Sequence, residues 1–318
     1  MRVTGEDLDS ELETPILFLV FNRPEVTKKV FDRIREAKPK YLYVAADGPR
    51  ETHPDDVAKC AKVRGTINEV DWDCKVNTLF REKNLGCGKA VSQAISWFFD
   101  HVEEGIILED DILPSLNFFQ FCEEMLHHYR YETKVMHISG LNFQKKKWGA
   151  YAYYFSSYAA SIWGWATWRD RWGKYVLKMD GVDAFLESDT FVEVLPLEPV
   201  RKHYSKALQA TATGQLNTWD YPWLYTFWKH KGLSIAPNFN MVNNIGFDAK
   251  DATHTVSRPS FLKLFHEKPQ VSIKNHPNLI ERNLDADLDR MKVKYLTKPP
   301  ILKRINLSKL ITLKNIFL

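Results

Sequence analysis

The sequence predicts an α/β fold in which a mainly parallel sheet is flanked by helices. Three observations carry this prediction: short apolar runs recur along the first half of the chain, amphipathic helical patterns separate them, and the runs end in polar or charged residues. The chain has 318 residues, of which 44% are hydrophobic, so it can bury a full core. We expect one large domain or two fused lobes.

The first strand is predicted at Ile16–Phe21, an apolar run that is too short for a typical helix. Pro24 follows it closely, and proline suits the first turn of a helix. Apolar residues then recur at helical spacing from Val26, and we expect this helix to end at Ala37, before Pro39. A strand followed by a helix is the usual opening of a parallel α/β sheet.

The same alternation continues along the first half of the chain. Strands are predicted at 41–47 and 75–82, and a glycine-containing loop at 83–89 opens a helix over 91–102. The next strand, 105–108, runs directly into three consecutive carboxylates.

Charged side chains follow the ends of these four strands. In open parallel sheets the ligand binds beyond the carboxyl ends of the strands, so we expect these side chains to converge on one rim. They are Arg23, Asp47, Arg81, Glu109, Asp110 and Asp111.

The second half of the chain is richer in aromatic residues. A strand and loop are predicted from Val135, and an aromatic stretch covers 148–172. A helix should begin near Trp219 and stop at Gly232, its C′ residue, before a last strand at 233–238. No internal repeat or low-complexity linker is visible, so this half should pack on the first.

The carboxylates Glu109, Asp110 and Asp111 allow two interpretations. In the first, the segment is a solvated loop and Asp111 caps the helix that covers Phe118 to Leu126. In the second, a divalent cation offsets the mutual repulsion of the three groups. Mg²⁺ and Mn²⁺ prefer one or two carboxylates together with phosphate oxygens, so the segment would hold a metal and a diphosphate.

The loop from Asn84 to Ala90 only partly matches a phosphate-binding loop. The Walker pattern needs glycine at position 83 and Ser or Thr at position 90, where this chain has Lys83 and Ala90. The glycines of the loop still open a helix whose N-terminal amides attract anions, and Lys89 adds positive charge there. A simple tight turn is the alternative.

Three features of the second half stay ambiguous from the sequence. The tryptophans between positions 163 and 168 suit either a core or a platform for a sugar ring. Asp220, which follows Trp219, is either a helix N-cap or a partly desolvated general base. His254 is a solvated residue, a metal ligand or a phosphate donor.

Taken in order, these residues resemble the GT-A nucleotide-sugar glycosyltransferases, and most of all the N-acetylglucosaminyltransferase I family with its bacterial relatives. The similarity covers roughly residues 14 to 255. It rests on the Glu-Asp-Asp motif, a Ser-x-x-Asn strand end, a Gly-Trp pair and a Trp-Asp pair. The resemblance implies a GT-A (Rossmann-like) fold with an acceptor-side subregion and a basic C-terminal tail.

The resemblance and the rim together suggest a role for each matched residue. Asp220 would be the catalytic base. The donor-binding residues would be Arg23, Asp47, Arg81, Lys89 and Asp110. The metal site would consist of Asp111 as direct ligand, supported by Glu109, and of His254. The acceptor would contact Asn142, Gly164, Trp165 and Trp219.

The predicted function is that of a metal-dependent, inverting glycosyltransferase that uses Mn²⁺ or Mg²⁺. By resemblance, it would move GlcNAc from UDP-GlcNAc to a hydroxyl of a glycan or lipid-linked acceptor. Two alternatives stay open: a sugar nucleotidyltransferase, although the segment 21–26 lacks the glycines of a triphosphate loop, and an inactive glycan-binding protein. A nucleic-acid partner is not expected, because the three carboxylates would repel phosphates.

The sequence is divided into a nucleotide-sugar-binding half (14–135), an acceptor-binding and catalytic half (136–260) and a basic extension (261–318). The polar start and the lack of an apolar run near roughly 18 residues predict a cytoplasmic enzyme, which fits bacterial surface polysaccharide biosynthesis. Over 301–318, cations alternate with apolar residues. This pattern suits either a packed helix or peripheral contact with the inner membrane. The four cysteines form no CxxC pair and are expected to be free thiols.

Overall fold

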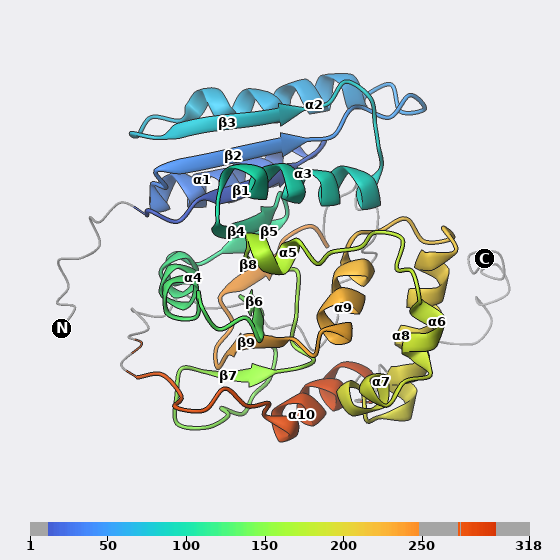
Figure 1. The fold of residues 1–318 in the computed structure, drawn as a ribbon. Helices are drawn as coiled ribbons and strands as arrows, with labels where there is room; N and C mark the ends of the chain where they lie inside the picture. Colours follow the sequence, from blue (N-terminus) through green and yellow to red (C-terminus); the bar gives the residue numbers. More distant parts are fainter. Residues whose placement is uncertain (1–11, 248–272, 274, 297–318) are drawn as a thin grey trace, which may run out of the picture.

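The computed structural model describes residues 12–247, 273 and 275–296 (Figure 1). Two of the sequence predictions fall outside these residues: the role of His254 and the amphipathic segment 301–318. Within the described part of the chain, none of the helices is both long enough and apolar enough to cross a membrane. The four cysteines are free, as the sequence predicts.

One eight-stranded sheet runs through the protein, from β3 at the top of Figure 1 to β7 at the bottom, in the order β3-β2-β1-β4-β8-β6-β9-β7. Neighbouring strands from β3 to β4 are parallel, as are β6 and β9, whereas β8 and β7 run antiparallel to their neighbours. The predicted α/β fold with a mainly parallel sheet is therefore confirmed. The strands are β1 (Ile16–Val20), β2 (Tyr41–Ala46), β3 (Lys75–Phe80), β4 (Glu104–Glu109), β6 (Val135–Ser139), β7 (Tyr153–Ser156), β8 (Trp165–Trp168) and β9 (Leu233–Pro237).

Helices cover both faces of this sheet, and a small second sheet pairs two short strands, β5 (Ile112–Pro114) and β10 (Val242–Asn244). The main helices are α1 (Pro24–Ala37), α2 (Asp56–Arg64), α3 (Cys87–His101), α4 (Leu116–His128), α8 (Glu198–Ala212), α9 (Asp220–Lys229) and α10 (Leu284–Tyr295). Shorter helical segments are η2 (Gly65–Glu69), α5 (Arg169–Trp172), α6 (Val182–Leu186) and α7 (Asp189–Val194).

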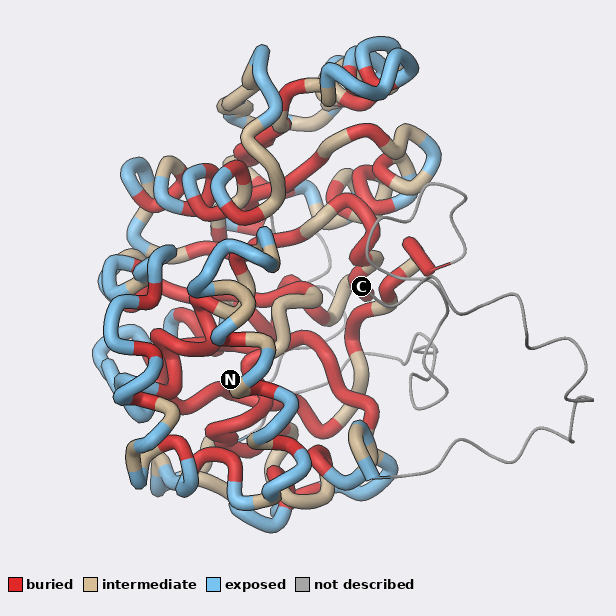
Figure 2. The backbone as a smooth tube through the Cα atoms, turned by 90° about the vertical axis from the view of Figure 1, so that its right-hand side faces the viewer, coloured by how far each residue is buried: buried red, intermediate tan, exposed pale blue. Residues whose placement is uncertain are grey.

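Successive side chains of β1 point to opposite faces of the sheet, and a different set of helices covers each face. Ile16 and Phe18 belong to the core under α1, α2 and α4, whereas Leu17 and Leu19 belong to the core under α3 and the helices from α5 to α9. All five residues of β1 are buried, as expected for a parallel strand covered on both faces. Figure 2 shows the result, with buried segments inside and exposed residues on the outer helices.

The aromatic stretch contains two strands that the sequence pattern does not predict, β7 and β8. Every residue of both strands is buried, so neither shows the alternation of apolar and polar residues that indicates a strand. Because β8 lies between β4 and β6, the second half of the chain extends the sheet of the first half. The helices α2, α8 and α10 are also absent from the sequence prediction.

The end of α9 differs by one residue from the prediction. Lys231 takes the left-handed conformation (φ 51°) and is the C′ residue, and its N–H donates to the Trp228 carbonyl at 2.9 Å. Gly232 is the next residue, and a Cβ there would lie 2.7 Å from Sδ of Met136. Glycine is therefore needed at position 232 because a side chain would clash with Met136 of β6. It is not needed for a left-handed backbone conformation, which Lys231 adopts instead.

A buried histidine in β6 makes the stability of this fold depend on pH. Nε2 of His137 lies 3.0 Å from the Ser161 carbonyl, and Nδ1 accepts the Trp223 indole N–H at 3.2 Å. The ring also stacks on Trp165, with centroids 5.0 Å apart. These contacts suit only a neutral imidazole with its proton on Nε2. Burial lowers the pKa of His137 to about 3.

We expect the free energy of unfolding to fall as the pH is lowered from about 6.5 toward about 3, because only the unfolded chain binds a proton at His137 in that window. Between about pH 7 and about pH 5 the loss from this residue should be about 2 kcal/mol. Urea unfolding of the wild type and of His137→Gln checks this, because glutamine does not titrate. The difference in the free energy of unfolding between the wild type and the variant should shrink as the pH falls. Parallel pH profiles of the two proteins would contradict the prediction.

Candidate active site

A cavity of about 440 Å³ opens at the carboxyl ends of β1 and β4. The strand order reverses between these two strands, because β2 and β3 extend the sheet on one side of β1 while β4 lies on the other. In open α/β sheets such a reversal leaves a crevice where ligands bind. The predicted rim residues Arg23, Asp47, Arg81, Glu109, Asp110 and Asp111 all line this cavity.

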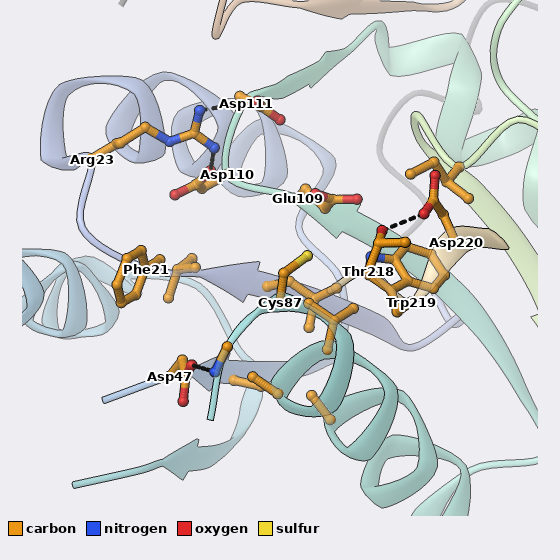
Figure 3. Close-up of a pocket in the computed structure, with 18 of the residues that line it drawn as sticks. Phe21, Arg23, Asp47, Cys87, Glu109, Asp110, Asp111, Thr218, Trp219 and Asp220 are labelled. Carbon is orange, nitrogen blue, oxygen red and sulfur yellow. Dashed lines mark hydrogen bonds and ion pairs between the residues drawn. The ribbon is translucent and has the colours of Figure 1, made fainter. Parts of the chain in front are cut away.

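One end of the cavity holds an ion-pair network. Nη1 of Arg23, the residue that precedes α1, lies 3.1 Å from Oδ2 of Asp111, and its Nη2 pairs with Asp110 (Figure 3). Burial alone would lower the pKa of Arg23, but the two carboxylates raise it above its ordinary value. Asp111 does not cap α4, because that helix begins at Leu116 after Ser115.

Two carboxylate oxygens near this network are shielded from solvent and have no hydrogen-bond partner among the described residues: Oε1 of Glu109 and Oδ2 of Asp110. Desolvation and the neighbouring carboxylates, Asp111 first, raise the pKa of Glu109. Burial raises the pKa of Asp110 to about 6, and the charge of Arg23 opposes that shift. A hard divalent cation prefers carboxylate oxygens, so Glu109 and Asp110 each offer one unpartnered ligand atom for the predicted metal. The described carboxylates of the cavity do not bring three ligand atoms within 4.8 Å of one another.

Asp220 lies on another wall of the cavity, with Glu109 between it and the Arg23 network in Figure 3. It is the first residue of α9, whereas Trp219 occupies the N-cap position without a side-chain cap. The N-cap alternative for Asp220 is therefore wrong. The hydroxyl of Thr218 donates to Asp220 Oδ1, and the carboxylate is half-buried. One hydrogen bond thus holds a carboxylate that still faces the cavity.

The described lining of the cavity is more negative than positive. It contains five carboxylates, Asp47, Glu109, Asp110, Asp111 and Asp220, and three arginines, Arg23, Arg50 and Arg81. Arg50 is paired with Asp56 outside the lining, with Nε 2.6 Å from Oδ2, whereas Arg81 has no ion-pair partner within residues 12–247. The carboxylates of the acidic end therefore disfavour an anionic ligand unless their charge is offset, while Arg81 could bind an anion.

The backbone amides at the N-terminus of α3 donate hydrogen bonds to side chains of the protein itself. The amides of Leu85 and Gly86 each lie 3.0 Å from a carboxylate oxygen of Asp47. The anion that these amides attract is thus Asp47 itself, which ties the end of β2 to the start of α3. Lys89 is exposed and does not line the cavity, so the structure does not place it where the sequence analysis predicts a donor contact.

The glycines of this loop allow Asn217 to approach α3. The Gly88 amide donates to Asn217 Oδ1 at 3.0 Å. A Cβ on Gly88 would lie 2.6 Å from that oxygen, and one on Gly86 would lie 2.5 Å from Asn217 Nδ2. The segment that carries Thr218 and Asp220 is therefore held against α3, and the two glycines serve this contact.

Three of the four residues predicted to contact the acceptor do not line this cavity. Trp165 is wholly buried and stacks on Trp219 with centroids 5.8 Å apart. Gly164 is buried, and Asn142 is buried with its Nδ2 donating to the Pro237 carbonyl at 2.7 Å. None of the three lines the cavity, so they support it from the core, whereas Trp219 borders it but is itself only 1% exposed.

Several lining residues are missing from the predicted set: Phe21, Arg50, Cys87, Trp163 and Thr218. Trp163 is half-buried, and it was already part of the tryptophan cluster in the sequence. Thr218 could have been found from its place two residues before Asp220. Burial raises the pKa of Cys87 to about 12, so it stays a neutral thiol and is no nucleophile.

No protein-family model matches the sequence, and no curated protein matches it. Among solved structures, the chain is similar to UDP-glucose pyrophosphorylase complexed with UDP-glucose, with a TM-score of 0.37 and 10% identity over 71% of this chain and 91% of that chain. It is also similar to 4-diphosphocytidyl-2C-methyl-D-erythritol synthase from Anaerococcus prevotii, with a TM-score of 0.30 and 7% identity over 56% of this chain and 79% of that chain. Similarity at these TM-scores carries no argument about function.

Proposed function

We propose that this protein transfers a sugar from a nucleotide-sugar donor to an acceptor hydroxyl, with inversion at the anomeric carbon. The observation that supports this function is one cavity with a buried acidic cluster at one end and the half-buried carboxylate of Asp220 on another wall. The first group suits a metal and a diphosphate, and the second suits a general base. The cavity lies at the carboxyl ends of β1 and β4, where the strand order reverses.

A divalent cation, Mn²⁺ or Mg²⁺, would be held by Asp111 with Glu109 and Asp110 beside it, and when bound it would neutralise the charge of the leaving diphosphate. Arg23 keeps the carboxylates of Asp110 and Asp111 in place through its two ion pairs. Arg81 would contact the anionic or ribose part of the donor, since this residue lines the same cavity.

Asp220 would accept the proton of the acceptor hydroxyl. The hydroxyl oxygen forms a bond to C1 of the sugar while the bond from C1 to the diphosphate oxygen breaks, and the nucleoside diphosphate leaves. Thr218 orients the Asp220 carboxylate through its hydroxyl. Trp163, which is half-buried and lines the cavity, would give the sugar rings an apolar surface.

Hydrolysis of a panel of UDP-, GDP- and CMP-sugars, with and without Mn²⁺, tests this proposal. We expect nucleotide release that depends on the metal and favours a UDP-sugar. Binding of glycans without release from any donor would instead support a glycan-binding protein, the third interpretation of the sequence.

Sugar nucleotidyl transfer is the second candidate, because a metal at the carboxylates of this cavity would also suit attack on a nucleoside triphosphate. The names of the two similar structures agree better with this candidate, and at TM-scores below 0.5 they do not decide between the two. Against it, the segment 21–26 that follows β1 contains no glycine, so no glycine-rich triphosphate loop follows that strand. Asn22 in this segment is buried and donates to Asp56 at 2.7 Å. Pyrophosphate release from a nucleoside triphosphate and a sugar 1-phosphate would favour this second candidate.

Replacing Gly88 with alanine should lower sugar transfer by up to about 10²-fold, although residue 88 makes no predicted contact with the substrate. The new Cβ would lie 2.6 Å from Asn217 Oδ1 and 3.1 Å from the Thr218 carbonyl, so the segment that carries Asp220 must shift. Steady-state kinetics of Gly88→Ala measure the effect. Gly65→Ala is the matched control, because a Cβ there meets nothing within 4 Å. Equal activity of the two variants would show that the Asn217 contact does not position Asp220.

A further inference from the structure

Three side chains that commonly bind metals meet beside α4, and none of them lines the cavity. Glu124 and His128 lie one turn apart on α4, and His276 belongs to the segment that precedes α10. One ligand atom from each residue lies within 4.8 Å of the other two. We propose that Glu124, His128 and His276 form a second metal site, which takes a transition-metal ion such as Zn²⁺.

The separation of two ligand atoms already suits a shared ion. Nε2 of His276 lies 3.2 Å from Oε1 of Glu124. Nitrogen and oxygen ligands that are each about 2.0–2.1 Å from one tetrahedral Zn²⁺ lie about 3.3 Å from each other. An ion could therefore bind both atoms with little movement of either side chain.

A buried hydroxyl holds the other ring nitrogen of His276. The Tyr153 hydroxyl lies 2.7 Å from Nδ1, and it is also hydrogen-bonded to the hydroxyl of Tyr129. Both tyrosines are buried, with exposed fractions of 1% and 2%. A hydroxyl both donates and accepts, so Nδ1 can carry the proton when Nε2 binds the ion. A hydrogen-bond partner on the second ring nitrogen fixes the tautomer and orientation of a metal-binding histidine. A simple surface ion pair does not need such a partner.

The third ligand has to turn when the ion binds. The rings of His128 and His276 are stacked, with centroids 3.6 Å apart and an angle of 11° between their planes. One ion cannot lie in the planes of two nearly parallel rings, so one ring must rotate. His128 is exposed, whereas His276 is held by Tyr153, so we expect the His128 ring to be the one that rotates.

The ligand types distinguish this site from the acidic end of the cavity. Two imidazoles and one carboxylate form a ligand set that binds Zn²⁺ in proteins, whereas the cavity offers carboxylate oxygens, which Mg²⁺ and Mn²⁺ prefer. The second site would join α4 to the segment before α10, so its first role is structural. This inference does not depend on the proposed sugar transfer.

Zinc binding to the full-length, chelator-treated protein tests the proposal, with excess Mg²⁺ present to occupy the carboxylates of the cavity. We expect an equimolar amount of Zn²⁺ to bind in competition with a chromophoric chelator, and Co²⁺ to give the visible absorption of a tetrahedral site. His276→Ala and Glu124→Gln should each weaken binding by ~100-fold or more, and Tyr153→Phe by ~10–100-fold. Circular dichroism checks that each variant is folded.

His127→Ala is the matched control, because His127 is the exposed neighbour of His128 on α4 and lies outside the cluster. It should bind Zn²⁺ like the wild type, and so should Asp111→Ala. Absence of binding by the wild type, unchanged affinity in His276→Ala, or an equal loss in His127→Ala would each overturn the proposal. Glu124 and His276 would then be a surface ion pair only.

Discussion

Asp220→Asn is expected to lower the rate of sugar transfer by a factor on the order of 10²–10⁴ while the nucleotide-sugar still binds. Asparagine has nearly the same shape as aspartate, and its carbonyl oxygen can still accept the hydrogen bond of the Thr218 hydroxyl. It cannot take up the proton of the acceptor hydroxyl. The loss should therefore appear in kcat for transfer, and the dissociation constant of the donor, measured by calorimetry, should stay close to that of the wild type.

Asp189→Asn is the matched control for this experiment. Asp189 is the first residue of α7, as Asp220 is of α9, but it is exposed and does not line the cavity. Both substitutions remove a negative charge at a helix N-terminus, so a general loss of helix stability would affect both variants. If transfer by Asp220→Asn continues at the original rate, Asp220 is not the base.

Asp111→Ala is expected to abolish metal-dependent turnover of the donor. The substitution removes the proposed direct ligand of the cation, while Arg23 keeps its ion pair with Asp110. Without the cation, the negative charges of Glu109 and Asp110 would remain at this end of the cavity. They would repel the diphosphate of the donor and so oppose its binding. Turnover measured over a range of Mn²⁺ concentrations, together with Mn²⁺ binding, checks this expectation.

Asp71→Ala serves as the control, because Asp71 is also paired with an arginine, Arg35, but at the exposed surface. That variant should keep its activity and its dependence on Mn²⁺. Asp111→Asn provides a second test if the alanine variant is less stable, because it keeps the size of the side chain. Near-normal turnover in both variants at position 111 would remove the cation from the proposed mechanism.

The strands of the first half could be predicted because local sequence determines them. Each of the strands from β1 to β4 is a short run, helices or loops separate them along the chain, and β1, β2 and β3 are neighbours in the sheet in their chain order. The meeting of Arg23 with Asp110 and Asp111 follows from the same pattern, since residues after parallel strands share one edge of the sheet. The strands β7 and β8 have four residues each and are buried throughout, so no periodic signal distinguishes them from buried helix.

The sequence by itself determined the α/β fold, the rim at which the charged residues gather, and the chemistry available there, because these depend on residue type and local pattern. Only the tertiary structure decided that Trp163 lines the cavity while Trp165 is buried, and that the loop amides bind Asp47. It also brought His276 to Glu124 on α4. These outcomes depend on which distant segments pack together, and packing is set by the shape and hydrogen-bonding needs of the whole core, which no local pattern contains.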